Sequence, residues 1–228
     1  DDAYVAVFWG EGGSFCAGWD LKYASSLEGE NPLSSLNIKK NRKKNLNGSD
    51  IPRGPMGPSR LELSKPVIGA IAGPAVAGGM ELALWCDFRV MEMSSYLGVY
   101  CRTWGIPLLD GGTVRLPRIV GQSRALEIAL TGRQIMAEEC LKLGLCEYVV
   151  EDKHSRKKAE ELAHNIARFP QECLKADRQS ILNQSTLTIK EGLSYEWDNS
   201  INIIVEEGIK GAKRFTRGHG RHGNFEDI

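Results

Sequence analysis

The feature that most constrains the fold is a buried strand followed by a glycine turn and a helix. Residues 67–72 read Val-Ile-Gly-Ala-Ile-Ala, a short apolar run typical of a strand that is covered on both faces. A Gly-Pro pair follows, and Gly78 and Gly79 precede the helix-favouring residues 80–85. The sequence therefore predicts a strand, a tight turn and a helix here.

Strands and helices alternate along the first two thirds of the chain, and helices alone follow. Further strands are predicted at residues 4–9, 87–91, 96–100 and 147–150, and helices at 123–130 and 136–143. This alternation predicts an α/β fold. Three more helices are predicted over residues 155–169, 172–183 and 189–215. We therefore expect a core of residues 1–154 and a C-terminal helical region of residues 155–228.

Two segments stand apart from this pattern. Residues 28–60 are rich in Gly, Pro, Asn and Ser, which predicts a long excursion from the core. Its basic run, residues 39–44, is expected to be solvated, with contact to the phosphates of a ligand as the alternative. The chain opens directly on the strand at 4–9, so we expect an N-terminal piece to be missing.

Composition excludes several classes of partner. The 29 Lys and Arg residues balance 29 Asp and Glu residues, so nothing points to nucleic acid. No apolar run reaches the roughly 18 residues of a membrane-spanning helix. The six cysteines form no Cys-x-x-Cys pair and the four histidines have no metal-ligand spacing, which predicts reduced thiols and no metal site. We expect an intracellular reducing compartment, either the cytoplasm or the mitochondrial or peroxisomal matrix.

Glu81 places a charge two residues after Gly79, inside an apolar run. A helix that begins at a glycine turn exposes backbone N–H groups, and Gly78 can offer one of them to an oxyanion. A second glycine-flanked amide is available in residues 16–18. Glu81 would then lie one turn inside the helix, near the carbon next to a polarised carbonyl, with apolar neighbours that raise its pKa. The alternative is a solvated first-turn glutamate that favours the helix dipole.

Four stretches in order, residues 15–21, 65–73, 75–87 and 111–117, resemble the crotonase, or enoyl-CoA hydratase/isomerase, superfamily. The resemblance continues through residues 130–133 and 143–145 to the helical tail. It implies a spiral of strand-strand-helix units and a C-terminal helical region that forms a homotrimer or a dimer of trimers.

The resemblance also implies a substrate and a site. The substrate is an acyl group carried as a coenzyme A thioester, and no cofactor is held permanently. The N–H groups of Ala17 and Gly78 would hold the thioester oxygen as it becomes enolate-like. Residues 17–20, which are Ala17, Gly18, Trp19 and Asp20, would line the acyl-CoA path.

Hydratases of this family use two glutamates, and Glu81 occupies only the first position. The second position falls on Cys101, counted from Gly111-Gly-Thr113. A thiol is a poor water-activating base unless its pKa is depressed, and Cys101 is equally read as a buried apolar residue. Asp110 offers another carboxylate near the place where related isomerases and dehydratases carry an aspartate, with a turn residue as the alternative. Arg102 and Trp104 either shape the acyl pocket or simply pack.

These observations predict an acyl-CoA enzyme in which Glu81 moves a proton and Asp110 or Cys101 supplies a second function. Hydration of a 2-enoyl-CoA is the leading interpretation. Isomerisation or another reaction through a thioester enolate is the second. A catalytically weak, CoA-binding or structural paralogue is the third, and the absent second glutamate motivates it.

Overall fold

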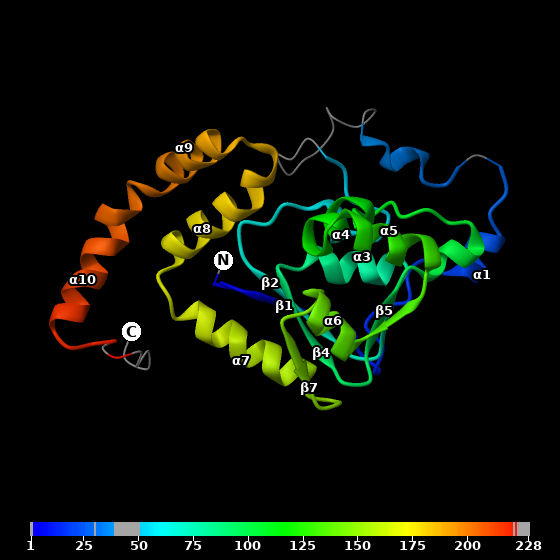
Figure 1. Cartoon of the computed structure of the whole chain (residues 1–228), viewed down its shortest axis with the longest axis horizontal. Coiled ribbons are helices and arrows are strands. Elements are labelled where there is room, and N and C mark those ends of the chain that lie inside the picture. The colour runs from blue at the N-terminus through cyan, green and yellow to red at the C-terminus, as the bar shows by residue number, and fades with distance from the viewer. Residues whose placement is uncertain (1, 30, 39–50, 221, 223–228) are drawn as a thin grey trace. The chain divides into compact units, whose positions relative to one another are not determined.

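The computed structural model describes residues 2–29, 31–38, 51–220 and 222, so the basic run 39–44 lies outside the described residues. The chain forms two compact units, traced along the chain in Figure 1. The larger takes in residues 7–63 and 67–161, and the smaller residues 1–6, 64–66 and 162–228. The domain boundary after residue 154 stays a prediction.

The larger unit contains a four-stranded sheet with the order β1-β2-β4-β7. Its strands are β1 (Ala6–Trp9), β2 (Val67–Ile71), β4 (Phe88–Glu92) and β7 (Tyr148–Val150). Strand β4 runs parallel to both β2 and β7. All four lie where the sequence predicts strands. Every residue of β2 is buried, as its unbroken apolar run predicts.

A second, three-stranded sheet has the order β3-β5-β6. Its strands are β3 (Pro74–Val76), β5 (Tyr96–Gly98) and β6 (Gln134–Met136). Strand β5 is parallel to β3 and antiparallel to β6. The sequence analysis missed β3 and β6, because a three-residue strand is too short to show an alternating pattern. It also made β5 too long, since the chain turns into the 3₁₀ helix η3 (Tyr100–Trp104).

Helices cover these strands. They are α1 (Leu21–Ser25), α3 (Gly78–Trp85), α4 (Gly112–Val120), α5 (Gln122–Thr131) and α6 (Ala137–Leu143), with 3₁₀ turns η1 (Ser34–Leu36) and η2 (Pro58–Arg60). Helices α3, α4 and α5 pack in succession in Figure 1. The sequence analysis missed α4, because it begins at a glycine and carries Pro117 inside it.

The core of this unit is apolar and closely packed. Its most deeply buried side chains include Ile68, Ile71, Met80, Met91, Leu97, Leu116, Ile128, Ile135 and Leu145. All six cysteines are free, as predicted. Burial raises the pKa of Cys86, Cys140 and Cys146 to about 12, so these thiols are neutral apolar fillers.

The C-terminal segment is helical, as predicted. It contains α7 (Ser155–Ala167), α8 (Gln171–Asn183), the 3₁₀ turn η4 (Gln184–Thr186), α9 (Ile189–Ser200) and α10 (Ile209–Thr216). The single helix expected over residues 189–215 is wrong, because a π-helical turn, η5 (Ile204–Gly208), separates α9 from α10. Within the described residues, no helix combines the length and apolar character needed to cross a bilayer.

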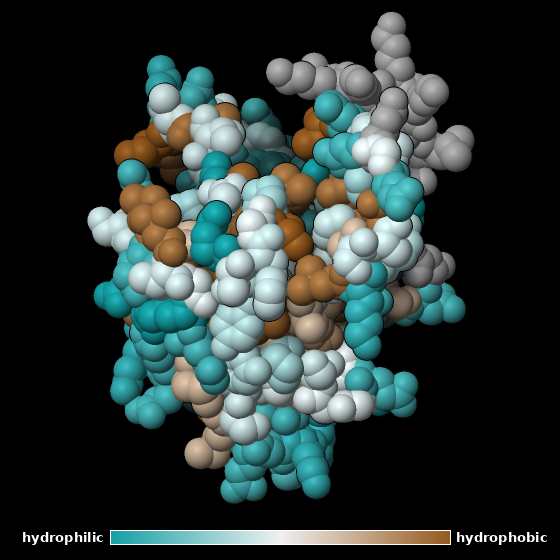
Figure 2. All heavy atoms as spheres, turned by 90° about the vertical axis from the view of Figure 1, so that its right-hand side faces the viewer, coloured by the Kyte–Doolittle hydropathy of each residue, from teal (hydrophilic) through white to brown (hydrophobic). Residues whose placement is uncertain are grey.

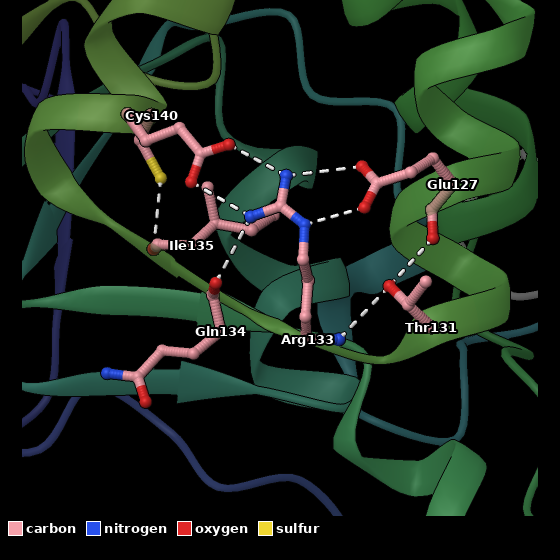
Figure 3. A network of polar contacts seen from close by, with 7 residues as sticks. Glu127, Thr131, Arg133, Gln134, Ile135 and Cys140 are labelled. Atoms are coloured by element: carbon pink, nitrogen blue, oxygen red, sulfur yellow. Dashed lines mark hydrogen bonds and ion pairs between the residues drawn. The ribbon is translucent and has the colours of Figure 1, made fainter.

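Arg133 joins α5, β6 and α6 on the surface of the larger unit (Figure 3). Its guanidinium lies between two carboxylates, with Nε 2.6 Å from Glu127 Oε1 and Nη2 2.7 Å from Glu139 Oε1. Second bonds of 3.1 and 2.9 Å make both pairs bidentate. We call these three residues the Arg133 cluster.

Candidate active site

A tight turn before α3 brings two distant pieces of backbone together. Ala77 has φ 54° and ψ −124°, a conformation that an L-residue rarely adopts and that marks functional turns. Cys16 pairs with β3 on the other side, through Cys16 N to Pro74 O (3.2 Å) and Val76 N to Cys16 O (3.0 Å). A Cβ on Gly79 would lie 1.9 Å from Cys16 O, so only glycine permits this approach.

This approach places the amides of Ala17 and Gly78 beside the same cavity. Neither N–H donates to another group within the part of the chain that the structure describes. Gly78 is the first residue of α3, where N–H groups have no partner in the helix and the dipole favours negative charge. The two amides are therefore available to an oxyanion, as the sequence analysis expects.

Glu81 is 3% exposed, which excludes the solvated first-turn glutamate. Its Oε1 accepts hydrogen bonds from Asp110 N (2.9 Å) and Gly112 N (2.7 Å). Burial raises the pKa of Glu81 above its usual range, and the nearby Asp110 adds to this, while the two amide donors oppose it. A carboxyl group with a raised pKa can take up and release a proton closer to neutral pH.

The cavity beside these groups is mostly apolar and measures about 210 Å³. It is lined by Ala17, Trp19, Leu21, Leu33, Pro55, Met56, Val76, Ala77, Gly78, Glu81, Tyr100, Cys101, Trp104, Ile106, Pro107, Leu109 and Asp110. Figure 2 looks onto the side of the molecule that carries α1 and shows hydrophobic residues gathered between hydrophilic margins. A pocket with few polar groups among apolar walls suits an acyl chain joined to a polar head.

The structure brings most of the predicted site residues to this cavity. Beyond the amides and Glu81, it is lined by Trp19, Cys101 and Asp110. Gly18 and Asp20 do not line it. The Asp20 carboxylate instead caps α1, accepting from Lys22 N at 2.8 Å and Tyr23 N at 3.2 Å. Their contact with substrate stays a prediction.

Cys101 lies in the cavity at the position predicted for the second hydratase carboxylate. It is 7% exposed, and burial together with the charge of Glu81 raises its pKa. The depressed pKa that would make this thiol a base is therefore not found. Cys101 acts at neutral pH as an uncharged wall residue.

Asp110 is the other carboxylate of the cavity and is 3% exposed. Its Oδ1 accepts from Met56 N at 2.9 Å and from the Ser59 hydroxyl. These donors lie more than fifty positions away along the chain, whereas a simple turn residue bonds its own turn. Asp110 therefore connects the segment around η2 to the turn before α4.

The sequence analysis missed the walls that come from distant segments. Leu33, Pro55 and Met56 belong to the stretch interpreted as an excursion, and no local pattern there predicts contact with Glu81. Trp104 does line the cavity, while Arg102 Nε donates instead to Ala129 O at 3.2 Å. The described part of the chain contains no cluster of metal-ligating side chains.

The sequence matches known proteins over nearly its whole length. The model of the family "Enoyl-CoA hydratase/isomerase" matches residues 1–219. The enoyl-CoA hydratase EchA19 of Mycobacterium tuberculosis is 31% identical over 220 residues, which are 93% of this chain and 76% of that protein. The putative enoyl-CoA hydratase/isomerase YngF of Bacillus subtilis is 34% identical, over 85% of this chain and 65% of that protein.

Solved structures agree with this likeness. The crystal structure of an enoyl-CoA hydratase from Bacillus anthracis superposes with a TM-score of 0.78 at 31% identity, covering 93% of this chain and 78% of that one. An enoyl-CoA hydratase from Mycobacterium tuberculosis H37Rv gives 0.77 at 29% identity. These neighbours confirm the predicted crotonase-like α/β fold. The chain belongs to the enoyl-CoA hydratase/isomerase family of the crotonase superfamily.

Proposed function

We propose that the chain hydrates a 2-enoyl-CoA in the cavity beside Glu81. The thioester oxygen accepts from the N–H groups of Ala17 and Gly78, and the acyl group enters the apolar cavity. The observation that carries this proposal is that two unpaired amides and a buried carboxyl group share one apolar cavity. An oxyanion hole next to a proton-transfer group is what chemistry through a thioester enolate requires.

In this reaction the water oxygen bonds to the β-carbon and its proton passes to Asp110. The electron pair of the double bond moves toward the thioester oxygen, where the two amides stabilise the negative charge. Glu81 then gives its proton to the α-carbon, a role that its raised pKa favours. The two carboxyl groups exchange one proton through solvent and are reset.

One observation favours a second candidate, the isomerisation of an enoyl-CoA. Cys101 has a raised pKa and supplies no base, while Glu81 alone can take a proton from one carbon and return it to another. The same two amides hold the enolate between these steps. The third hypothesis is a protein that binds a CoA thioester without turnover. Such binding requires the two amides but not the carboxyl groups.

Absorbance measurements separate these candidates. Hydration of crotonyl-CoA removes the absorbance of the conjugated double bond, and isomerisation of a 3-enoyl-CoA creates it. Loss with crotonyl-CoA supports the proposal. Gain with the 3-enoyl substrate alone supports isomerisation. Binding of a saturated acyl-CoA in calorimetry, with no turnover of either substrate, supports the binder and contradicts both reactions.

We also propose that the C-terminal helices assemble three copies of this chain, alone or as a dimer of trimers. Along α9, Ile189, Leu193 and Trp197 are 86, 61 and 64% exposed. Their spacing of four residues puts them on one face of the helix. Ile204 and Val205 continue the exposed apolar residues beyond α9. An apolar face of this kind is typical of a protein interface.

Light scattering on a sizing column tests the assembly. The wild-type chain should have three or six times the monomer mass. The double substitution Leu193→Gln with Trp197→Gln should reduce the measured mass to that of one monomer. Leu130→Gln, at an exposed apolar residue of α5 in the other unit, is the matched control. A wild-type monomer contradicts the proposal.

The remaining partners follow from the same site. We propose that coenzyme A enters as part of the substrate, that no cofactor is held permanently, and that neither nucleic acid nor a membrane is a partner. Six free cysteines support a reducing intracellular compartment. Treatment with a thiol-reactive reagent after unfolding should count six thiols.

A further inference from the structure

Arg115 does not line the cavity, but it donates to the backbone of Asp110, which carries one of the two carboxyl groups there. It comes from α4, and its guanidinium donates to two backbone carbonyls from different segments. Nη1 donates to Asp110 O at 2.9 Å, and Nη2 donates to Ser59 O at 2.8 Å. Arg115 therefore connects the η2 segment to the turn that carries Asp110.

The same two segments are joined a second time by side chains. The Ser59 hydroxyl and Met56 N both donate to Asp110 Oδ1. Asp110 N in turn donates to Glu81 Oε1. Arg115 thus binds the carbonyl of Asp110, and Glu81 accepts from the amide of the same residue. Ser59 is fully buried, so this network is closed to solvent on that side.

The fit around the guanidinium is tight. Gly111 has φ 97°, which favours glycine, and a Cβ there would lie 2.2 Å from Arg115 Nη1 and displace the guanidinium from Asp110 O. Burial lowers the pKa of Arg115, and the charges of Glu81 and Asp110 raise it again. Since an arginine guanidinium loses its proton only in strong base, it remains cationic at neutral pH. Arg115 is thus a fixed positive charge close to both carboxyl groups.

We propose that Arg115 is a positioning residue that fixes Asp110 against Glu81 and supplies the positive charge that lets two buried carboxyl groups share one cavity. Two like charges in a buried site oppose each other's ionisation, and a nearby cation offsets this. Because Arg115 donates to carbonyls, both carboxyl groups stay available for proton transfer. This inference rests on the proposed role of Glu81.

Direct titration of Glu81 tests the charge without any need for turnover. The chain is labelled with ¹³C at the glutamate carboxyl carbons, and Glu81→Gln identifies the Glu81 signal by its loss. The groups that titrate near Glu81 in the described residues are Asp110 and Cys101, besides Arg115. In Arg115→Gln the pKa of Glu81 should rise, and in Arg115→Lys it should stay near the wild-type value.

Steady-state kinetics test the positioning. Arg115→Lys keeps the charge but not the planar fork, so kcat should fall about tenfold with KM little changed. Arg118→Gln is the matched control, because Arg118 lies three residues further along α4, is exposed and, among the described residues, donates to Val114 O alone. It should change neither the titration nor kcat.

The outcomes separate the two proposals. If Glu81 titrates as in the wild type in folded Arg115→Gln, the charge role is wrong, whatever the substrate. If Arg115→Gln does not fold, Arg115→Lys decides, and an unchanged kcat overturns the positioning role. If no CoA thioester is turned over by the wild type, the proposed function fails, while the titration still judges Arg115.

Discussion

Among the described residues, two groups of two carboxylates and one arginine are built in opposite ways. In the Arg133 cluster (Figure 3), the guanidinium binds Glu127 and Glu139 directly, and all three side chains are between 33 and 40% exposed. In the second group, which we call the cavity group, Arg115 does not line the cavity and its guanidinium donates to backbone carbonyls, and Glu81 and Asp110 are each only 3% exposed.

The two arrangements have opposite effects on the acids. Arg133 lowers the pKa of Glu127 and Glu139, so both stay ionised and bound at neutral pH. Burial raises the pKa of Glu81, and no arginine contacts its oxygens within the described residues. An arginine that pairs directly with a carboxylate makes it a structural contact. An arginine that binds only nearby backbone carbonyls leaves the carboxyl group free to exchange protons.

The largest effect is expected from a substitution in the cavity group, Glu81→Gln. Glu81→Gln keeps an oxygen that can accept from Asp110 N and Gly112 N but cannot transfer a proton. Turnover of crotonyl-CoA should fall about 10³-fold, with binding of a saturated acyl-CoA nearly unchanged. Glu127→Gln is the matched change in the Arg133 cluster and should leave turnover within twofold. Equal effects of the two substitutions would show that Glu81 has no chemical role.

The next largest effect is expected when a carboxylate is added to the cavity. Cys101→Glu places an acid at the wall that faces Glu81, and the isosteric Cys101→Gln is its control. This acid can activate water in addition to Asp110, so hydration of crotonyl-CoA should rise about tenfold over Cys101→Gln. The initial rate of absorbance loss measures it. Equal rates in both variants would show that an acid at position 101 adds nothing to the base that Asp110 provides.

Stability should depend on pH through Glu81. Because the folded-state pKa is raised, its contribution to stability is present below the ordinary value of 4.5 and is lost as pH rises through the folded value. Gln does not titrate, so the unfolding free energy of Glu81→Gln relative to the wild type should increase across this window. The increase is about 1.4 kcal/mol for each unit between the two pKa values. Urea unfolding at several pH values measures it, and a constant difference would contradict the raised pKa.

The smallest effect is expected when the surface arginine, Arg133, is replaced. Arg133→Gln should lower the unfolding free energy by about 1 kcal/mol at neutral pH and leave turnover unchanged, since exposed ion pairs contribute little. Glu127 and Glu139 have lowered pKa values, so this contribution is present above 4.5 and is lost as pH falls through their folded values. Urea unfolding at neutral and acidic pH checks both statements. A loss that persists in acid would point to packing instead of charge.

The sequence predicted the parts of the site that local signals encode. The apolar run of β2, the two glycines that begin α3 and the position of Glu81 all depend on neighbouring residues. Four motifs in order also identified the family and placed Ala17 and Gly78 together. Strand β3 was missed because three residues are too few to show an alternating pattern, and helix α4 because Pro117 interrupts the helical one.

The supporting network was out of reach for a different reason. Arg115 contacts a carbonyl 56 positions earlier, and Ser59 contacts a carboxylate 51 positions later. Neither residue belongs to a pattern of charge or period, and each looks like an ordinary surface residue in the sequence. Such contacts are set by how the chain returns on itself, which needs the folded structure.

The unpaired amides of Ala17 and Gly78 have a consequence for hydrogen–deuterium exchange. Their neighbours Cys16 and Val76 use their N–H groups in backbone bonds, so deuterium should replace those hydrogens slowly. Ala17 and Gly78 should exchange quickly although they lie beside the core, and a bound thioester should slow both together. Exchange at these two amides therefore reports whether a thioester is bound.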